Sequence, residues 1–162
     1  MNQPIRIPET RRQGHSELIP AIKASRKDVG KATQRLLGTW RLVAFTRNGQ
    51  PHPVYGREPS GMIRYDASGN MAVQIMPERS SPQSDVAEPT PGTASAIPGY
   101  IAYFGGYRVD ERAKTVAHDR IGNLTPGEPR TVVRHYAFLS DDRLALTLGE
   151  DATAQVLWQR VR

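Results

Sequence analysis

The sequence predicts a single all-β domain, an antiparallel up-and-down β-barrel of about eight strands, preceded by a short helix and a flexible basic arm. Two observations lead to this prediction. From Thr39 onward, short segments with alternating apolar side chains follow one another, joined mostly by turns of a few residues and uninterrupted by any helical pattern. A chain of 162 residues also has enough mass for one core. Closing such a sheet removes the unpaired edges that a flat sheet would expose.

The basic charge of the chain is concentrated before the predicted barrel. We divide the chain into residues 1–35, a basic arm with a short helix, and residues 36–162, the barrel domain. The first 38 residues hold eight Lys and Arg but three Asp and Glu, which accounts for most of the net charge of +6. No aromatic residue that could stack on bases precedes Trp40, so we do not expect nucleic acid as a partner.

The predicted elements follow from local patterns. Asp28 is a suitable N-cap for a short helix, and Gly38 is well placed to end it. Asn48-Gly49 and the segment 66–69 are expected to form turns. The predicted strands cover residues 39–47, 62–65, 71–75, 100–109, 115–121, 131–139, 143–148 and 155–161.

A proline-rich segment breaks this pattern. Residues 77–99 contain five prolines and no regular periodicity, which predicts a long irregular loop at one mouth of the barrel. Such a loop could act as a lid over the interior or remain a plain flexible connection.

Several classes of chemistry lack their sequence signals. The chain has no cysteine, which excludes disulfides and is typical of a cytoplasmic protein. No apolar run approaches the roughly 20 residues of a membrane helix. Without a glycine-rich phosphate-binding motif we expect no nucleotide cofactor, and indeed no cofactor at all. The four histidines show no ligand-like spacing, so a metal site is not expected.

A set of short motifs carries a family resemblance. Gly38-Thr39-Trp40 opens the first strand, Tyr103-Phe104-Gly105-Gly106-Tyr107 lies in a middle strand, and Leu157-Trp158-Gln159-Arg160 ends the last one. Over residues 36–161 the chain resembles the bacterial lipocalin-like domain family of calycin-type small β-barrels. The resemblance implies a barrel that encloses a small hydrophobic molecule. It also implies that Trp40 closes one barrel end, with Arg160 packed across its ring.

The chain departs from the family pattern in three places. Asp119 stands where the family often has a second histidine, the loop 123–127 lacks the aromatic residue that the family usually has there, and the basic arm has no counterpart. Related barrels range from ligand carriers to cyclases, so the resemblance leaves the activity open.

Candidate ligand-binding residues lie in the middle strands. Tyr103 and Tyr107 share one strand face, with Gly105 between them, where its small size leaves room for a ligand or a bent backbone. Their hydroxyls could bind a ligand oxygen, or the rings could simply pack in the core. His118 could bind a ligand or, paired with Tyr103, handle protons.

Arg134 alternates with apolar residues on one strand face, and a buried arginine needs an anion or a carboxylate. Arg134 could receive a ligand carboxylate or enolate, or it could pair with Asp119. The opposite register of this strand, which would turn Val133 inward in place of Arg134, also stays open. Tyr65 and Gln74 are further candidates for the polar lining.

We therefore expect the barrel to bind a small hydrophobic molecule. The alternative is a cofactor-independent cyclase or isomerase of a polyketide-like or terpenoid-like substrate, with Tyr103 and His118 as its catalytic residues. A third possibility is an interaction protein that uses the basic arm, and a homodimer stays open.

Overall fold

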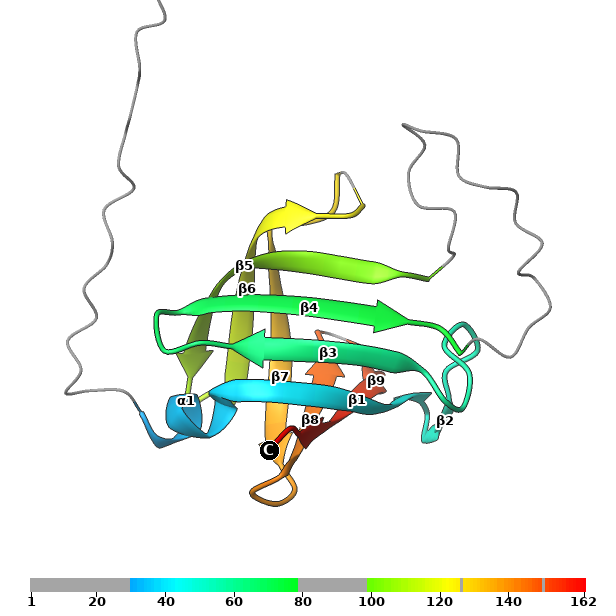
Figure 1. Ribbon diagram of the computed structural model, residues 1–162, viewed down its shortest axis with the longest axis horizontal. Helices are drawn as coiled ribbons and strands as arrows, with labels where there is room; N and C mark the ends of the chain where they lie inside the picture. Colours follow the sequence, from blue (N-terminus) through cyan, green and yellow to red (C-terminus); the bar gives the residue numbers. More distant parts are fainter. Residues whose placement is uncertain (1–29, 79–98, 126, 150) are drawn as a thin grey trace, which may run out of the picture.

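The strands form a closed antiparallel barrel. The computed structural model describes residues 30–78, 99–125, 127–149 and 151–162. Within this part of the chain, the strands pair antiparallel in the order β2-β1-β3-β4-β5-β6-β7-β8-β9, and β1 also pairs with β9. Because β2 is only a two-residue extension beside the end of β1, eight strands make up the barrel (Figure 1). The predicted fold class is confirmed.

The elements follow the predicted order. They are α1 (Lys31–Leu36), β1 (Gly38–Arg47), β2 (Gln50–Pro51), β3 (Ser60–Tyr65), β4 (Asn70–Met76), β5 (Ile101–Asp110), β6 (Thr115–Asn123), β7 (Thr131–Phe138), β8 (Arg143–Leu148) and β9 (Asp151–Arg160).

The helix is shorter than predicted and runs straight into the barrel. It begins after the N-cap Gly30, whereas the expected cap, Asp28, lies outside the described residues. Gly38 ends it as predicted: its φ of 114° is accessible mainly to glycine and lets β1 start at once. In the part of the chain described here, no helix is both long and apolar enough to cross a membrane.

The predicted tight turns are present. Asn48 and Gly49 have φ angles of 51° and 74°, the backbone that favours Asn-Gly in two-residue hairpins. In the turn between β3 and β4, the Asp66 carboxylate accepts hydrogen bonds from the backbone N–H groups of Ser68 and Asn70. Residues 79–98 lie outside the described residues, so the expectation of a lid stays untested.

Trp40 and Arg160 close one end of the barrel. Trp40 is fully buried, and its Nε1–H donates to the carbonyl of Leu36 at 2.8 Å. The Arg160 guanidinium lies 4.1 Å from the Trp40 ring centroid and donates to the carbonyls of Leu37 and Arg35. The arrangement that the resemblance implied is present, and it satisfies carbonyls at the end of the helix that would otherwise lack partners.

The helix α1 is attached to the turns at this same end. The backbone N–H of Ala32 donates to Glu111 Oε1 at 2.8 Å, in the turn after β5. Arg35 bonds Asp141 in the turn after β7 and lies 4.1 Å from the Phe138 ring centroid. The opposite end, where β1 and β4 finish and β5 begins, holds the remaining interior space.

Gly105 serves close strand packing. The pairing of β5 with β6 shifts register between Phe104 and Gly105, which marks a β-bulge. A side chain on Gly105 would collide with the backbone oxygen of Asp119 and come within 2.9 Å of the Ile121 nitrogen. Of the two roles predicted for this glycine, the bent backbone is therefore the one observed.

We expect Gly105→Ala to lower the free energy of unfolding by about 2–3 kcal/mol, since the rigid β6 backbone must move to admit the methyl group. Gly106→Ala is the matched control. Its added carbon would lie 3.6 Å from the nearest atom, so we expect a change below about 1 kcal/mol. Urea denaturation of both variants checks this, and equal effects would contradict it.

We expect Arg160→Met to lower the free energy of unfolding by about 2–3 kcal/mol, because it removes the contact with Trp40 and orphans two carbonyls. Arg162→Met removes only an exposed ion pair with Asp142 and should cost at most about 1 kcal/mol. The same denaturation experiment compares the two variants. If the Arg160 variant is as stable as the Arg162 variant, the contact between Arg160 and Trp40 does not stabilise the barrel.

Candidate functional site

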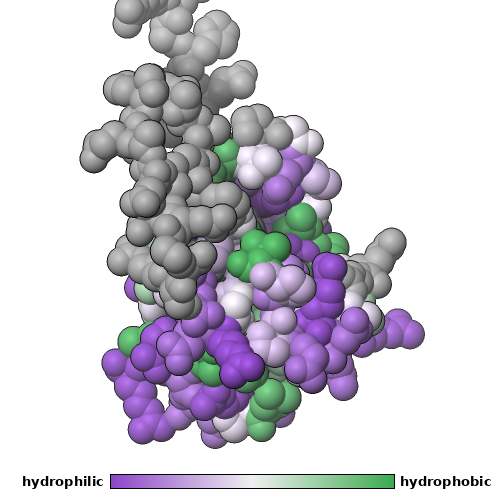
Figure 2. Space-filling model, turned by 90° about the vertical axis from the view of Figure 1, so that its right-hand side faces the viewer, coloured by the Kyte–Doolittle hydropathy of each residue, from purple (hydrophilic) through white to green (hydrophobic). Residues whose placement is uncertain are grey.

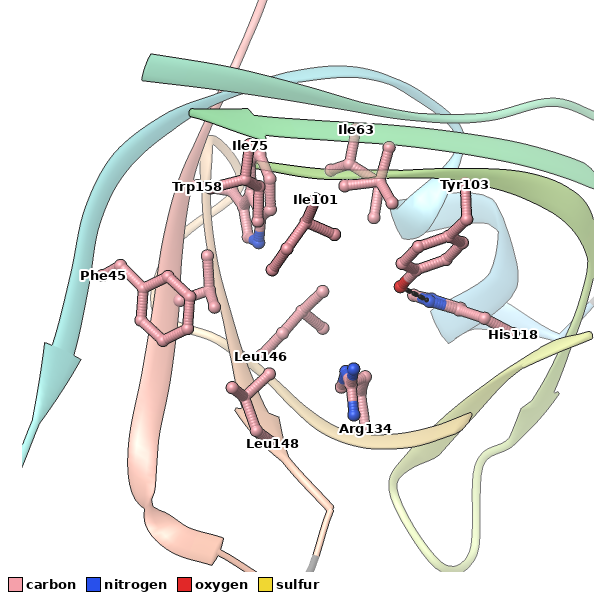
Figure 3. Close-up of a pocket in the computed structure, with 12 residues that line it drawn as sticks. Phe45, Ile63, Ile75, Ile101, Tyr103, His118, Arg134, Leu146, Leu148 and Trp158 are labelled. Atoms are coloured by element: carbon pink, nitrogen blue, oxygen red, sulfur yellow. Dashed lines mark hydrogen bonds between the residues drawn. The ribbon is translucent and has the colours of Figure 1, made fainter. Parts of the chain in front are cut away.

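A mainly apolar cavity lies in the half of the barrel away from α1 (Figure 3). Its volume is about 50 Å³. The cavity is therefore large enough for a few water molecules as it stands. Its lining comprises Phe45, Ile63, Val73, Ile75, Ile101, Tyr103, His118, Arg134, Leu146, Leu148, Val156 and Trp158.

Tyr103, His118 and Tyr65 form a buried hydrogen-bonded chain. The Tyr103 hydroxyl lies 2.8 Å from Nδ1 of His118, and the Tyr65 hydroxyl lies 2.8 Å from Nε2 of the same ring. Strands β5, β6 and β3 supply these residues, and His118 and Tyr65 are each only 1% exposed. Both nitrogens of the imidazole are therefore used inside the protein.

Burial keeps His118 neutral. Burial, and after it the positive charge of Arg134, lowers the pKa of His118 from 6.5 to about 3. Burial likewise raises the pKa of Tyr103 and raises that of Tyr65 well above 10.0. Near neutral pH, the hydrogen-bonded chain of side chains thus consists of one neutral imidazole between two neutral phenols.

A neutral imidazole has one N–H, so it donates to one tyrosine and accepts from the other. Tyr65 is sealed, and among the described residues His118 is its hydrogen-bond partner. Tyr65 must therefore donate to Nε2, since otherwise its own proton would be buried without an acceptor. Nδ1–H then donates to Tyr103, which leaves the Tyr103 proton free to point into the cavity.

Arg134 brings a positive charge to the cavity wall. It lies on the inward face of β7, as predicted, and is partly buried. Its Nη1 donates to the backbone oxygen of Val133 at 3.3 Å. The expected alternative partner, Asp119, lies on the outer face instead, where it bonds Arg108 and Thr131. That alternative is wrong because neighbouring residues of β6 face opposite sides, and His118 takes the inside.

Trp158 contributes a further polar atom to the cavity. The side chain is 1% exposed, and its Nε1 has no hydrogen-bond partner within the described chain. Figure 3 shows the indole across the cavity from Tyr103 and His118. The sequence suggested Trp158 only as a family motif residue; its unpaired donor depends on the neighbours that the fold supplies.

Arg120 is a second inward arginine that the sequence analysis did not select. It follows His118 by two residues on the same face of β6, so the strand period could have indicated it. Its guanidinium bonds the carboxylate of Glu128 and the carbonyl of Pro129, and lies 5.4 Å from the Tyr103 ring centroid. The charge of Arg120 is therefore matched within the protein.

The structure places three of the six expected ligand-binding residues on the cavity wall: Tyr103, His118 and Arg134. Tyr65 stands behind His118. Tyr107 is turned to the β3–β4 turn, where it donates to the Asp66 carbonyl at 2.9 Å.

Gln74 is a correction, because its side chain is exposed on the outer face of β4 between inward Val73 and Ile75. Outside, polar residues cover much of the side seen in Figure 2, and hydrophobic residues form separate patches.

Comparison with protein families agrees with this architecture. The lipocalin-like domain family matches residues 37–161. The chain belongs to this family. Among solved structures, a redesigned β-barrel is similar with a TM-score of 0.45 and 14% identity, over 83% of this chain and 99% of that chain. No curated protein matches the chain significantly.

We expect the protein to lose about 2 kcal/mol of stability as the pH falls from 6.5 to 4.5. The unfolded chain protonates His118 near pH 6.5, but the folded protein does so only near 3, so protons favour unfolding in this window. Hydrogen-bonded carboxylates such as Asp119 add to the loss only below about pH 4.

His118→Gln should flatten this pH dependence while lowering stability overall. His135→Gln, a change at an exposed position, should keep the slope of the native protein. Chemical denaturation at several pH values makes the measurement. An unchanged slope in the His118 variant would mean that another group is responsible.

Proposed function

We propose that this lipocalin-like barrel binds a small, largely apolar molecule in the cavity that Phe45, Ile101 and Leu148 help to line. The observation that supports the proposal is the composition of the wall, in which eight aliphatic or phenyl side chains surround four polar ones. Ligand sites are typically of this kind, mainly apolar with a few polar groups that fix orientation. The barrel of this family is also compatible with such a ligand.

The space is small without a ligand, so binding requires side chains to shift. Ile101 and Leu148 are only partly buried and lie near the strand ends, where such shifts displace least of the core. The opposite half, with Trp40 and Leu36 fully buried, is packed solid and has no such freedom.

One observation favours a second function, a cofactor-independent isomerase or cyclase. The hydrogen bond of 2.8 Å between Tyr103 and His118 is a route for a proton at the cavity wall. A pKa of about 3 makes His118 a weak base, however, and the buried Tyr65 ends the route. The geometry therefore supports binding better than proton abstraction.

We expect small neutral apolar probes, hexanol, octanol and indole, to bind saturably to the full-length protein. In proton–nitrogen correlation spectra, the amide resonances of cavity-lining strands should shift while those of α1 stay in place. Retained small molecules found by native mass spectrometry would identify natural ligands.

Two isoleucines provide a matched pair of variants. Ile101→Trp should fill the cavity and abolish binding, whereas Ile121→Trp, at a position 72% exposed on the outer face, should leave it intact. Binding that survives Ile101→Trp, or no binding of any probe to the native protein, would refute the proposed function.

A further inference from the structure

Three side chains with hydrogen-bond donors line the cavity, and the wall offers fewer acceptors than donors. The donors are the Tyr103 hydroxyl, the Arg134 guanidinium and the Trp158 indole N–H. None of the residues that line the cavity carries a carboxylate. The wall is thus short of acceptors and has an excess of positive charge, which the ligand has to complement.

The two inward arginines differ in whether a carboxylate of the protein balances their charge. Arg120, two residues beyond His118, has Glu128 and the Pro129 carbonyl as partners. Arg134 donates to the Val133 carbonyl at 3.3 Å and lies within hydrogen-bonding reach of the Tyr103 hydroxyl, but it has no ion pair with a carboxylate in the described part of the chain. A partly buried guanidinium that lacks a counter-ion is a ready receptor for an anion, above all a carboxylate.

The two tryptophans show the same contrast for a neutral donor. Trp40 Nε1–H donates to the Leu36 carbonyl at 2.8 Å, as buried indoles usually do. Trp158 is equally buried but has no partner, and leaving a buried N–H unpaired destabilises the protein. A ligand oxygen in the cavity would supply the missing acceptor.

Because Figure 3 shows Arg134 and Trp158 on different sides of the cavity, one small group cannot satisfy both. We infer that the ligand is an apolar carboxylic acid with a second acceptor oxygen: its carboxylate binds Arg134, next to the Tyr103 hydroxyl, and a ketone, ether or hydroxyl oxygen accepts from Trp158. Aliphatic side chains such as Ile101 and Leu146 hold the apolar body between the two ends. This inference rests on the proposed function and names the class of its ligand.

The first test compares octanoate, octanamide and octylamine, which share an apolar chain and differ in the charge of the head group. We expect the acid to bind at least about tenfold more tightly than the isosteric amide, and the amine most weakly. Titration of the full-length protein by calorimetry measures the three affinities.

Arg134→Met keeps an unbranched apolar stem and removes the charged guanidinium. It should reduce octanoate to the affinity of octanamide, and Arg134→Lys should restore part of the preference. Arg130→Met, at an exposed position before β7, should change nothing. Correlation spectra of each variant establish that it is folded.

The second test uses the two indole N–H resonances, one for each tryptophan of the chain. Oxo-octanoates with the ketone at successive chain positions are titrated against octanoate itself. We expect at least one of them to move the Trp158 indole resonance downfield more than octanoate does. The Trp40 resonance should stay in place, because its hydrogen bond to Leu36 is already formed.

Each failure has a distinct meaning. If octanamide binds in the cavity as tightly as octanoate, the acidic ligand is refuted while the proposed function stands. If no ketone position moves the Trp158 resonance, the second acceptor is refuted. If neither acid nor amide binds, or Ile101→Trp leaves their binding unchanged, the proposed function itself fails.

Discussion

The pairing of β1 with β9 is the constraint on which the other features depend, because it turns an open sheet into a closed wall. One ladder sets both ends of the barrel. At one end it places Arg160 opposite Trp40, where the cation covers the indole; at the other it places Val156 opposite Phe45, on the cavity wall. A bulge near Leu42 lets the strand bend between the two. The burial that results is what keeps His118 neutral.

Much of the fold could be predicted from the sequence, because its turns are encoded locally. Asn48-Gly49 and the Asp66 turn fix hairpins whose strands alternate as expected, and an up-and-down order needs no long-range information beyond closure. The resemblance to known barrels supplied the contact between Trp40 and Arg160, which residue patterns alone do not give.

The candidate site was only partly predictable, because it depends on register and on missing partners. Tyr103 and His118 were selected as residues of neighbouring strands, but the role of Tyr65 requires the third strand in place. Gln74 was misplaced although inward Val73 and Ile75 flank it, a signal that the two-residue period contained. The unpaired N–H of Trp158 is visible only when its whole surroundings are known.

The attachment of α1 to two turns has a consequence for how the domain can be built into larger assemblies. Glu111 and Asp141 hold the helix against the closed end of the barrel. The polypeptide therefore joins the barrel at Gly30, at the end opposite the strand ends that frame the cavity. A protein fused ahead of Gly30 would therefore be attached at the end of the barrel that Trp40 and Arg160 close, and not at the end that holds the cavity.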